Sequence, residues 1–149
     1  MATTAISLTG RALRLLSARE HSRAELQHKL ARFEDEPGAL AKVLDALQAK
    51  DFINEARVVE SVVHRRSAKL GASRIRQELQ AKGLEPEAVA QAIEQLRASE
   101  TERAREVWRK KFGAPPADAL ERGKQMRFLA SRGFGGDTIH RVVQGGDGE

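Results

Sequence analysis

The stretch Ser73-Arg-Ile-Arg-Gln-Glu-Leu-Gln-Ala-Lys-Gly-Leu84 decides the fold of this chain. Ile75 and Leu79 are four residues apart, a spacing that places both side chains on one face of a helix. Gly83 then marks the helix end, because glycine readily adopts the left-handed conformation that ends many helices. The pattern predicts a helix over residues 72–82 with one apolar face.

This pattern recurs about fifty residues away on either side. Leu129-Ala-Ser-Arg-Gly-Phe134 repeats the helix end, and Leu26-x-x-x-Leu30 repeats the apolar pair. An apolar-striped helix precedes and follows each copy, so the chain is predicted to contain three copies of one three-helix unit. The predicted units are residues 1–54, 55–98 and 99–144, with residues 145–149 as a flexible tail.

Helix-start signals subdivide these units. Capping-box spacing is present where a serine or aspartate precedes a glutamate by three residues. The pairs are Ser22 with Glu25, Ser99 with Glu102, and Asp118 with Glu121. Asn54 and Asp137 are further predicted caps, and Pro86 suits a first helical position. These signals predict about nine helices, near residues 10–19, 22–32, 38–50, 54–69, 72–82, 86–98, 99–112, 118–131 and 137–143.

The predicted fold class is all-α. Tyrosine is absent, and no segment alternates between apolar and polar residues for long, so strand signals are missing. A unit of about fifty residues buries too little core to be secure alone, so neighbouring units must stack. Stacking predicts an elongated, curved, right-handed-type array of three-helix repeats whose long face suits a large partner.

Charge is unevenly distributed along this basic chain, which has a formal net charge of +5. Two stretches are rich in basic residues and contain no acid, namely residues 61–77 and 122–132. Such blocks favour association with polyanions, although each is also compatible with an ordinary solvated helix face.

Catalytic and metal-binding patterns are not found in the sequence. The chain has no cysteine, and its four histidines lack the spacing of a helical metal pair. His21 and His28 are seven residues apart, but no third ligand is evident. Trp108 is expected in the core, beside Val107 and Phe112. No apolar run is long enough to cross a bilayer. We therefore expect a cytoplasmic binding protein with no cofactor.

Several segments resemble the RecX family of bacterial regulators of the RecA recombinase. Phe52-Ile-Asn-Glu-Ala-Arg57 and the stretch from Ser73 to Leu84 look like the central repeat of that family. The segment Leu13 to Leu30 looks like its first repeat, and Ala104 to Phe134 looks like its third. The chain departs from the family pattern at Asn54-Glu55, at Val58 and at Arg32-Phe33-Glu34, which lacks the Lys-Gly-apolar ending of the other repeats.

The resemblance implies a monomer that binds RecA filaments on single-stranded DNA. It further implies inhibition of ATP hydrolysis, strand exchange and SOS co-protease function, with weaker affinity for single- and double-stranded DNA. We predict a binding face formed by Arg65, Arg66, Lys69, Arg74, Arg76, Lys82, Arg127 and Arg132.

Two alternatives stay open on the sequence alone. The first is a DNA-binding protein that uses residues 73–82 as the recognition helix of a helix-turn-helix. The second is a helical scaffold for an unrelated protein partner.

Overall fold

The computed structural model describes residues 6–144, and in this range it contains helices and no strand. They are α1 (Leu8–Ala18), α2 (Arg23–Leu30), the 3-10 helix η1 (Ala31–Phe33), α3 (Ala39–Ala49), α4 (Glu55–Arg66), α5 (Ala72–Ala81), α6 (Pro86–Arg97), α7 (Glu100–Lys111), α8 (Ala119–Ser131) and α9 (Gly136–Val143). The predicted all-α class and the nine α-helices are confirmed for these residues. The predicted tail at residues 145–149 lies outside them.

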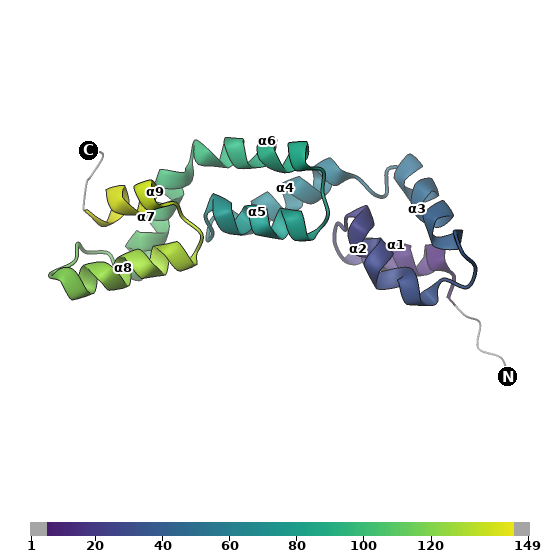
Figure 1. The fold of residues 1–149 in the computed structure, drawn as a ribbon, viewed down its shortest axis with the longest axis horizontal. Coiled ribbons are helices and arrows are strands. Elements are labelled where there is room, and N and C mark those ends of the chain that lie inside the picture. Colours follow the sequence, from purple (N-terminus) through teal and green to yellow (C-terminus); the bar gives the residue numbers. More distant parts are fainter. Residues whose placement is uncertain (1–5, 145–149) are drawn as a thin grey trace.

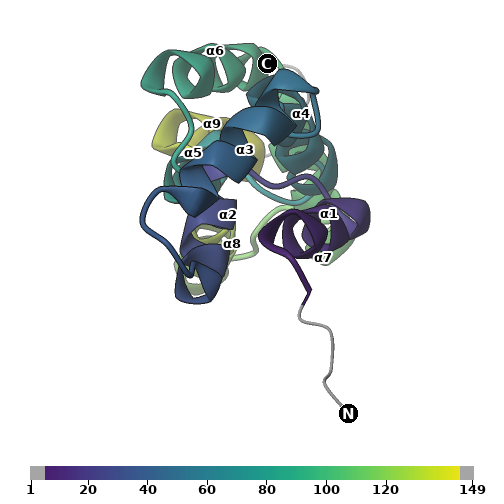
Figure 2. The ribbon, with the colours of Figure 1, turned by 90° about the vertical axis from the view of Figure 1, so that its right-hand side faces the viewer.

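The helices form three bundles arranged in a row, which gives the molecule an elongated, curved shape (Figure 1). Repeat 1 contains α1–α3, repeat 2 contains α4–α6, and repeat 3 contains α7–α9. Figure 2 looks along this row with repeat 1 in front. Each repeat encloses its own apolar cluster. The repeat boundaries at residues 54 and 98 stay predictions.

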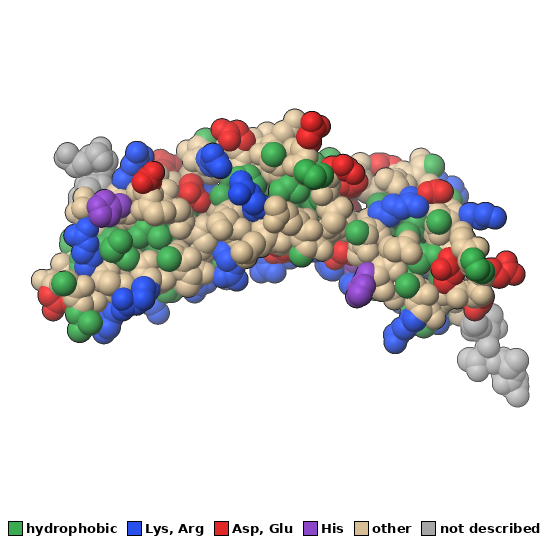
Figure 3. Space-filling model, in the orientation of Figure 1, with side chains coloured by type: hydrophobic (Ala, Val, Ile, Leu, Met, Phe, Trp, Pro, Cys, Tyr) green, Lys and Arg blue, Asp and Glu red, His purple; other side chains and the backbone are tan. Residues whose placement is uncertain are grey.

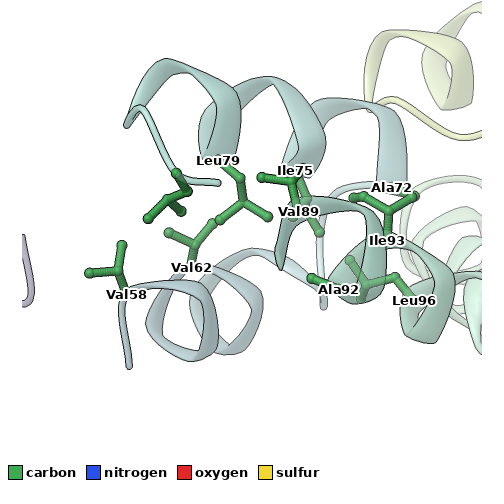
Figure 4. Close-up of a cluster of buried hydrophobic side chains, with 10 residues drawn as sticks. Val58, Val62, Ala72, Ile75, Leu79, Val89, Ala92, Ile93 and Leu96 are labelled. Carbon is green, nitrogen blue, oxygen red and sulfur yellow. The ribbon is translucent and has the colours of Figure 1, made fainter. Parts of the chain in front are cut away.

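The core of repeat 2 illustrates how one bundle is held together (Figure 4). Val62 of α4, Ile75 and Leu79 of α5, and Ile93 of α6 are all buried and belong to one cluster. Burying each such side chain stabilises the fold by about 1.5–3 kcal/mol. A change of the fully buried Ile75 to alanine leaves a cavity in this cluster and costs about 2–5 kcal/mol.

Local side-chain caps explain where several helices begin. The Ser22 side chain accepts from the Glu25 amide, and the Glu25 carboxylate accepts from the Ser22 amide, so this capping box is confirmed. Asn54 and Asp118 cap α4 and α8 by accepting from backbone amides three residues later. Pro86 occupies the first turn of α6 as predicted.

Two predicted caps are wrong. Ser99 does not accept from the α7 backbone, because its hydroxyl instead donates to the Leu96 carbonyl and accepts from the Arg103 side chain. Asp137 lies inside the first turn of α9, and Gly135 is the residue that precedes this helix.

Three helices from different repeats follow one another end to end along the molecule, in the order α8, α5, α2 (Figure 1). At the joint between repeats 3 and 2, the Gly71 amide donates to the Arg132 carbonyl at 2.8 Å. The Ser73 amide donates to the Gly133 carbonyl at 3.3 Å. Gly133 has a φ of 90°, a left-handed conformation that side chains disfavour. The end of α8 and the start of α5 therefore satisfy each other's backbone groups.

The joint between repeats 2 and 1 has the same arrangement but different chemistry. The Ser22 hydroxyl, at the start of α2, donates to the Lys82 carbonyl at the end of α5. The Lys82 ammonium also pairs with Glu25 at 3.2 Å. Arg57 of repeat 2 pairs with Glu20 of repeat 1 at 3.0 Å. This joint therefore depends on side chains, most of them charged.

Two side chains of α7 strengthen the joint between repeats 2 and 3. Glu100 accepts from the Ala72 amide at 2.8 Å, which caps α5 where Gly71 has no side chain to do so. The Arg103 guanidinium donates to the Ser67, Leu70 and Leu96 carbonyls. Among the described residues, no helix is long and apolar enough to cross a membrane.

Candidate partner-binding surface

Charged side chains are distributed unequally over the molecule (Figure 3). Lysine and arginine side chains are frequent along the lower, hollowed edge in this view, and acidic side chains are more frequent along the opposite edge above α6. The curved body therefore presents an edge of positive potential to any partner that fits its concave side.

One hollow lined by cations, with an aromatic ring at its centre, lies between repeats 2 and 3. Here Lys69, Lys110, Lys111 and Arg132 surround Phe128 in a hollow of about 360 Å³. We call these five residues the junction cluster. The Arg132 guanidinium lies 4.9 Å from the Phe128 ring centroid, and the Lys111 ammonium lies 5.4 Å from it. No acidic residue lines this hollow.

Helix ends hold these cations in place. Lys110 and Lys111 occupy the last turn of α7, and Arg132 directly follows α8. Cations are favoured at such positions because the carboxyl end of a helix carries partial negative charge. Phe112 packs edge-to-face on Phe128, with 5.5 Å between the ring centroids. The aromatic centre is thus fixed. Lys110 also lies 4.0 Å from Glu106, whereas Lys69 and Lys111 are exposed and available to an anion.

Arg65 and Arg66, at the end of α4, share one acidic partner. Glu78 of α5 lies 3.6 Å from Arg65 and 2.9 Å from Arg66. The two arginine side chains stay 41% and 45% exposed. Since one carboxylate faces two guanidinium groups, a net positive charge remains at this position beside Lys69.

The other predicted residues lie in different surroundings. The Arg74 guanidinium donates to the Ser131 carbonyl and so helps to hold the joint. Arg76 lines a separate hollow that also contains Arg97, Glu100 and Asp137. Arg127 is exposed on α8. None of these three residues lines the hollow of the junction cluster.

Lys82 does not lie on an open binding face. Its side chain is only 11% exposed and is paired with Glu25 in the joint between repeats 1 and 2. The burial of Lys82 against repeat 1 gives it a structural role, so we remove it from the predicted set. Of the eight predicted residues, only Lys69 and Arg132 belong to the junction cluster.

The histidines are not arranged to hold a metal. Both ring nitrogens of His21 are in use, with Nδ1 3.0 Å from the Arg19 carbonyl and Nε2 3.1 Å from the Lys29 ammonium. Burial lowers the pKa of His21, which favours its neutral form. Across residues 6–144, no group of three or more metal-ligating side chains comes together.

Comparison with known families matches each repeat in turn. Residues 10–47 match the model described as RecX, first three-helix domain, and residues 54–93 match RecX, second three-helix domain. Residues 98–143 match RecX, third three-helix domain. The chain belongs to the RecX family. The family resemblance predicted from the sequence is therefore confirmed.

Relatives in this family match almost the whole chain. The regulatory protein RecX of Leptothrix cholodnii is 54% identical over 144 residues, which cover 97% of this chain and 92% of the relative. The RecX protein of Herminiimonas arsenicoxydans is 49% identical over 144 residues, covering 97% and 93% of the two chains. These names support a regulatory role for the present chain.

Solved RecX structures share the fold. The crystal structure of RecX from Lactobacillus salivarius aligns with a TM-score of 0.75 at 20% identity, covering 95% of this chain and 96% of that one. A second crystal structure of a regulatory protein RecX aligns with a TM-score of 0.74 at 20% identity, covering 91% and 70%. The three-repeat architecture is therefore common to RecX chains of very different sequence.

Two of the four cations in the junction cluster of this RecX chain, Lys110 and Lys111, are absent from the predicted binding face. Lys110 and Lys111 lie more than forty residues from Lys69 and approach it only because repeat 3 stacks on repeat 2. A local signal was present, since both lysines follow Trp108 and precede Phe112 at a helix end. Acids earlier in α7, such as Glu102 and Glu106, kept this segment out of the acid-free blocks.

Proposed function

We propose that this chain binds the RecA filament on single-stranded DNA and suppresses ATP hydrolysis, strand exchange and SOS co-protease activity. It acts as a cytoplasmic monomer and a binding protein rather than an enzyme, with weaker direct affinity for single- and double-stranded DNA. Membership of the RecX family supports the regulatory role. The single observation that carries the proposed binding face is the junction cluster, in which four cations surround Phe128 and, among the described residues, the only acidic partner is Glu106, 4.0 Å from Lys110 and outside the lining of the hollow.

The shape of the molecule supports a simple mode of action. A curved body of three stacked repeats can follow a helical groove and contact several RecA protomers at once (Figure 1). The basic edge faces the nucleic acid, and the bulk of the repeats excludes a second DNA strand or a protein substrate. Cations at the junction cluster then contribute through phosphate contacts, which release counterions and depend on salt.

The helix-turn-helix alternative has less support from the geometry. In helix-turn-helix proteins, residues near the start of the recognition helix contact the base edges. Here the start of α5 is occupied by repeat 3, because the Gly71 and Ser73 amides donate to the end of α8. Sequence-specific reading by α5 would require this joint to open.

The direct test is RecA ATP hydrolysis on single-stranded DNA, measured while the protein is titrated from far below equimolar amounts. The informative variant is Lys69→Glu/Lys111→Glu, which reverses two exposed charges of the junction cluster. Its matched control is Lys42→Glu/Lys50→Glu, which makes the same change on the exposed surface of repeat 1. We expect the cluster variant to need at least about tenfold more protein for half-inhibition, equivalent to 1.4 kcal/mol of binding.

The shape of the titration distinguishes two mechanisms. Inhibition well below equimolar protein indicates capping or disassembly, whereas inhibition only near saturation indicates occupancy along the groove. Equal inhibition by the cluster variant and its control would remove the junction cluster from the binding face. No inhibition by the folded wild-type protein, together with binding to bare DNA, would favour the DNA-binding alternative.

A further inference from the structure

A second cationic hollow lies in repeat 1, away from the junction cluster and near the right-hand end of Figure 1. It has a volume of about 560 Å³ and is formed by α1, α2 and the short helix η1. We call it the repeat-1 hollow. Its cationic lining is Arg11, Arg14, Lys29 and Arg32, with His28 beside them, and its apolar lining is Leu15, Leu30 and Phe33.

The cations of this hollow have no acidic partner. Elsewhere in repeat 1, arginines are paired, since Arg19 contacts Glu25 at 2.8 Å and Arg23 contacts Asp45 at 2.7 Å. Among the described residues, neither Arg11 nor Arg32 forms an ion pair, and no acid lines the hollow. Excess positive charge therefore remains concentrated in one concave site.

The two arginines are held close together by one aromatic ring. The Arg11 guanidinium lies 3.7 Å from the Phe33 ring centroid, and the Arg32 guanidinium lies 4.7 Å from it. A cation–π contact contributes about 0.5–1 kcal/mol at an exposed site, so the ring stabilises the position of each guanidinium group. No acidic side chain of the lining pairs with either guanidinium group, and a carboxylate bound beside them would do so.

We propose that the repeat-1 hollow binds an acidic protein segment that carries one apolar side chain. Carboxylates of the segment contact Arg11, Arg14 and Arg32, with the bidentate geometry that guanidinium groups favour. The apolar side chain contacts Leu15, which lines the hollow and is only partly buried. The volume of the repeat-1 hollow lies within the range of about 300–1,000 Å³ that is usual for pockets that bind small ligands, so it can hold a short peptide segment.

Two features favour an acidic peptide over nucleic acid here. Single-stranded DNA binds by stacking its bases on exposed aromatic faces along an extended groove. In the repeat-1 hollow, guanidinium groups already lie over the Phe33 ring, and His28 is the only other ring in the lining. The site is also a compact hollow in one repeat rather than a track across several.

The test uses a short fluorescent peptide of aspartates and glutamates around a single leucine, titrated with the full chain at low salt. Fluorescence anisotropy reports binding. We expect Arg14→Glu to weaken binding at least about tenfold, while Lys42→Glu, an exposed charge reversal on α3 outside the hollow, leaves it within about twofold. A peptide with glycine in place of leucine is expected to bind several times more weakly, because the apolar contact is lost.

Fold integrity is checked by far-UV circular dichroism, and Arg14 is chosen because it is exposed and has no partner whose loss would unfold α1. A second variant, Arg32→Ala, removes one guanidinium from the Phe33 ring and is expected to weaken the same peptide. The proposal is overturned if Arg14→Glu binds as tightly as Lys42→Glu. It is also overturned if oligothymidylate competes fully for the site while the leucine peptide and its glycine version bind alike.

This inference is independent of the proposed RecA inhibition. The repeat-1 hollow and the junction cluster share no residue and lie in different repeats. Lys69→Glu/Lys111→Glu is therefore expected to retain peptide binding, and failure of one proposal does not imply failure of the other.

Discussion

Gly71 packs so closely against Gly133 that a methyl group on Gly71 would overlap the Gly133 peptide. The contact joins the start of α5 to the end of α8, and the Gly71 amide donates to the neighbouring Arg132 carbonyl. Two glycines sixty-two residues apart thus set the distance between repeats 2 and 3. Stacking of these repeats depends on the absence of side chains at one point.

We expect Gly71→Ala to destabilise the protein by about 1–3 kcal/mol, because the added methyl group forces the two backbones apart. Urea unfolding followed by circular dichroism measures the loss. Gly136→Ala is the matched control, since a side chain there meets nothing within 4 Å. Equal stability of the two variants would show that the joint adjusts without cost.

Replacement of Ser22 tests the other joint. Ser22→Ala removes the cap of α2 and also the hydrogen bond to the Lys82 carbonyl. Loss of a serine cap alone costs about 1 kcal/mol. Ser7→Ala provides that reference, because Ser7 caps α1 without contacting another repeat. We expect Ser22→Ala to lower the free energy of unfolding in denaturant by about 1 kcal/mol more than Ser7→Ala does. Equal losses in the two variants would show that the hydrogen bond to the Lys82 carbonyl contributes no net stability.

Acid is expected to weaken the same joint. Burial alone would raise the pKa of Glu25, but hydrogen bonds from Arg19, the Ser22 amide and Lys82 outweigh it and lower the pKa to about 2 from 4.5. The folded state therefore favours the ionised carboxylate. The resulting stability is present above pH 4.5 and is lost as the pH falls toward 2.

Unfolding free energies measured at a series of pH values test this linkage. The fall between pH 4.5 and 2 should be steeper for the wild type than for Glu25→Gln, which cannot titrate at this position. Other carboxyl groups contribute equally to both proteins and cancel in the difference. Parallel pH profiles would contradict the assignment of acid sensitivity to Glu25.

Buried Gln125 is expected to be needed for the packing of repeat 3. Its side-chain amide donates to the Ala114 carbonyl, and its oxygen accepts from the Trp108 indole at 2.8 Å. Gln125→Leu leaves both partners unsatisfied and should cost about 1–3 kcal/mol. Gln91→Leu, an exposed substitution on α6, is the control. Fluorescence of Trp108, the single tryptophan, should shift in Gln125→Leu and stay unchanged in the control.

Helix positions were predictable because they follow from local patterns. Apolar residues at spacings of three and four place each helix face, and caps such as Asn54 fix several starts within one or two residues. Ser99 misled the prediction because the chain stays near-helical between α6 and α7, with a φ of −109° and a ψ of 3°. An extended residue is needed for a capping box, and the sequence spacing does not reveal the backbone conformation.

The candidate surface was predictable only in part, because it combines residues from different repeats. Arg65, Arg66 and Lys69 stand out in the sequence as neighbouring cations without acids. Their neutralising partner Glu78 lies one helix away, and the partner of Lys82 lies in another repeat. Charge pairing across helices depends on the stacking geometry, which local sequence patterns do not encode.

The two joints are connected in series, so a force applied along the molecule acts on both equally and separates the weaker one first. Backbone hydrogen bonds and Arg103 secure repeat 3 to repeat 2. Repeat 1 is attached mainly through Ser22 and the ion pairs of Glu25 and Glu20. Repeat 1 therefore detaches at lower tension, and salt lowers that tension further by screening its ion pairs.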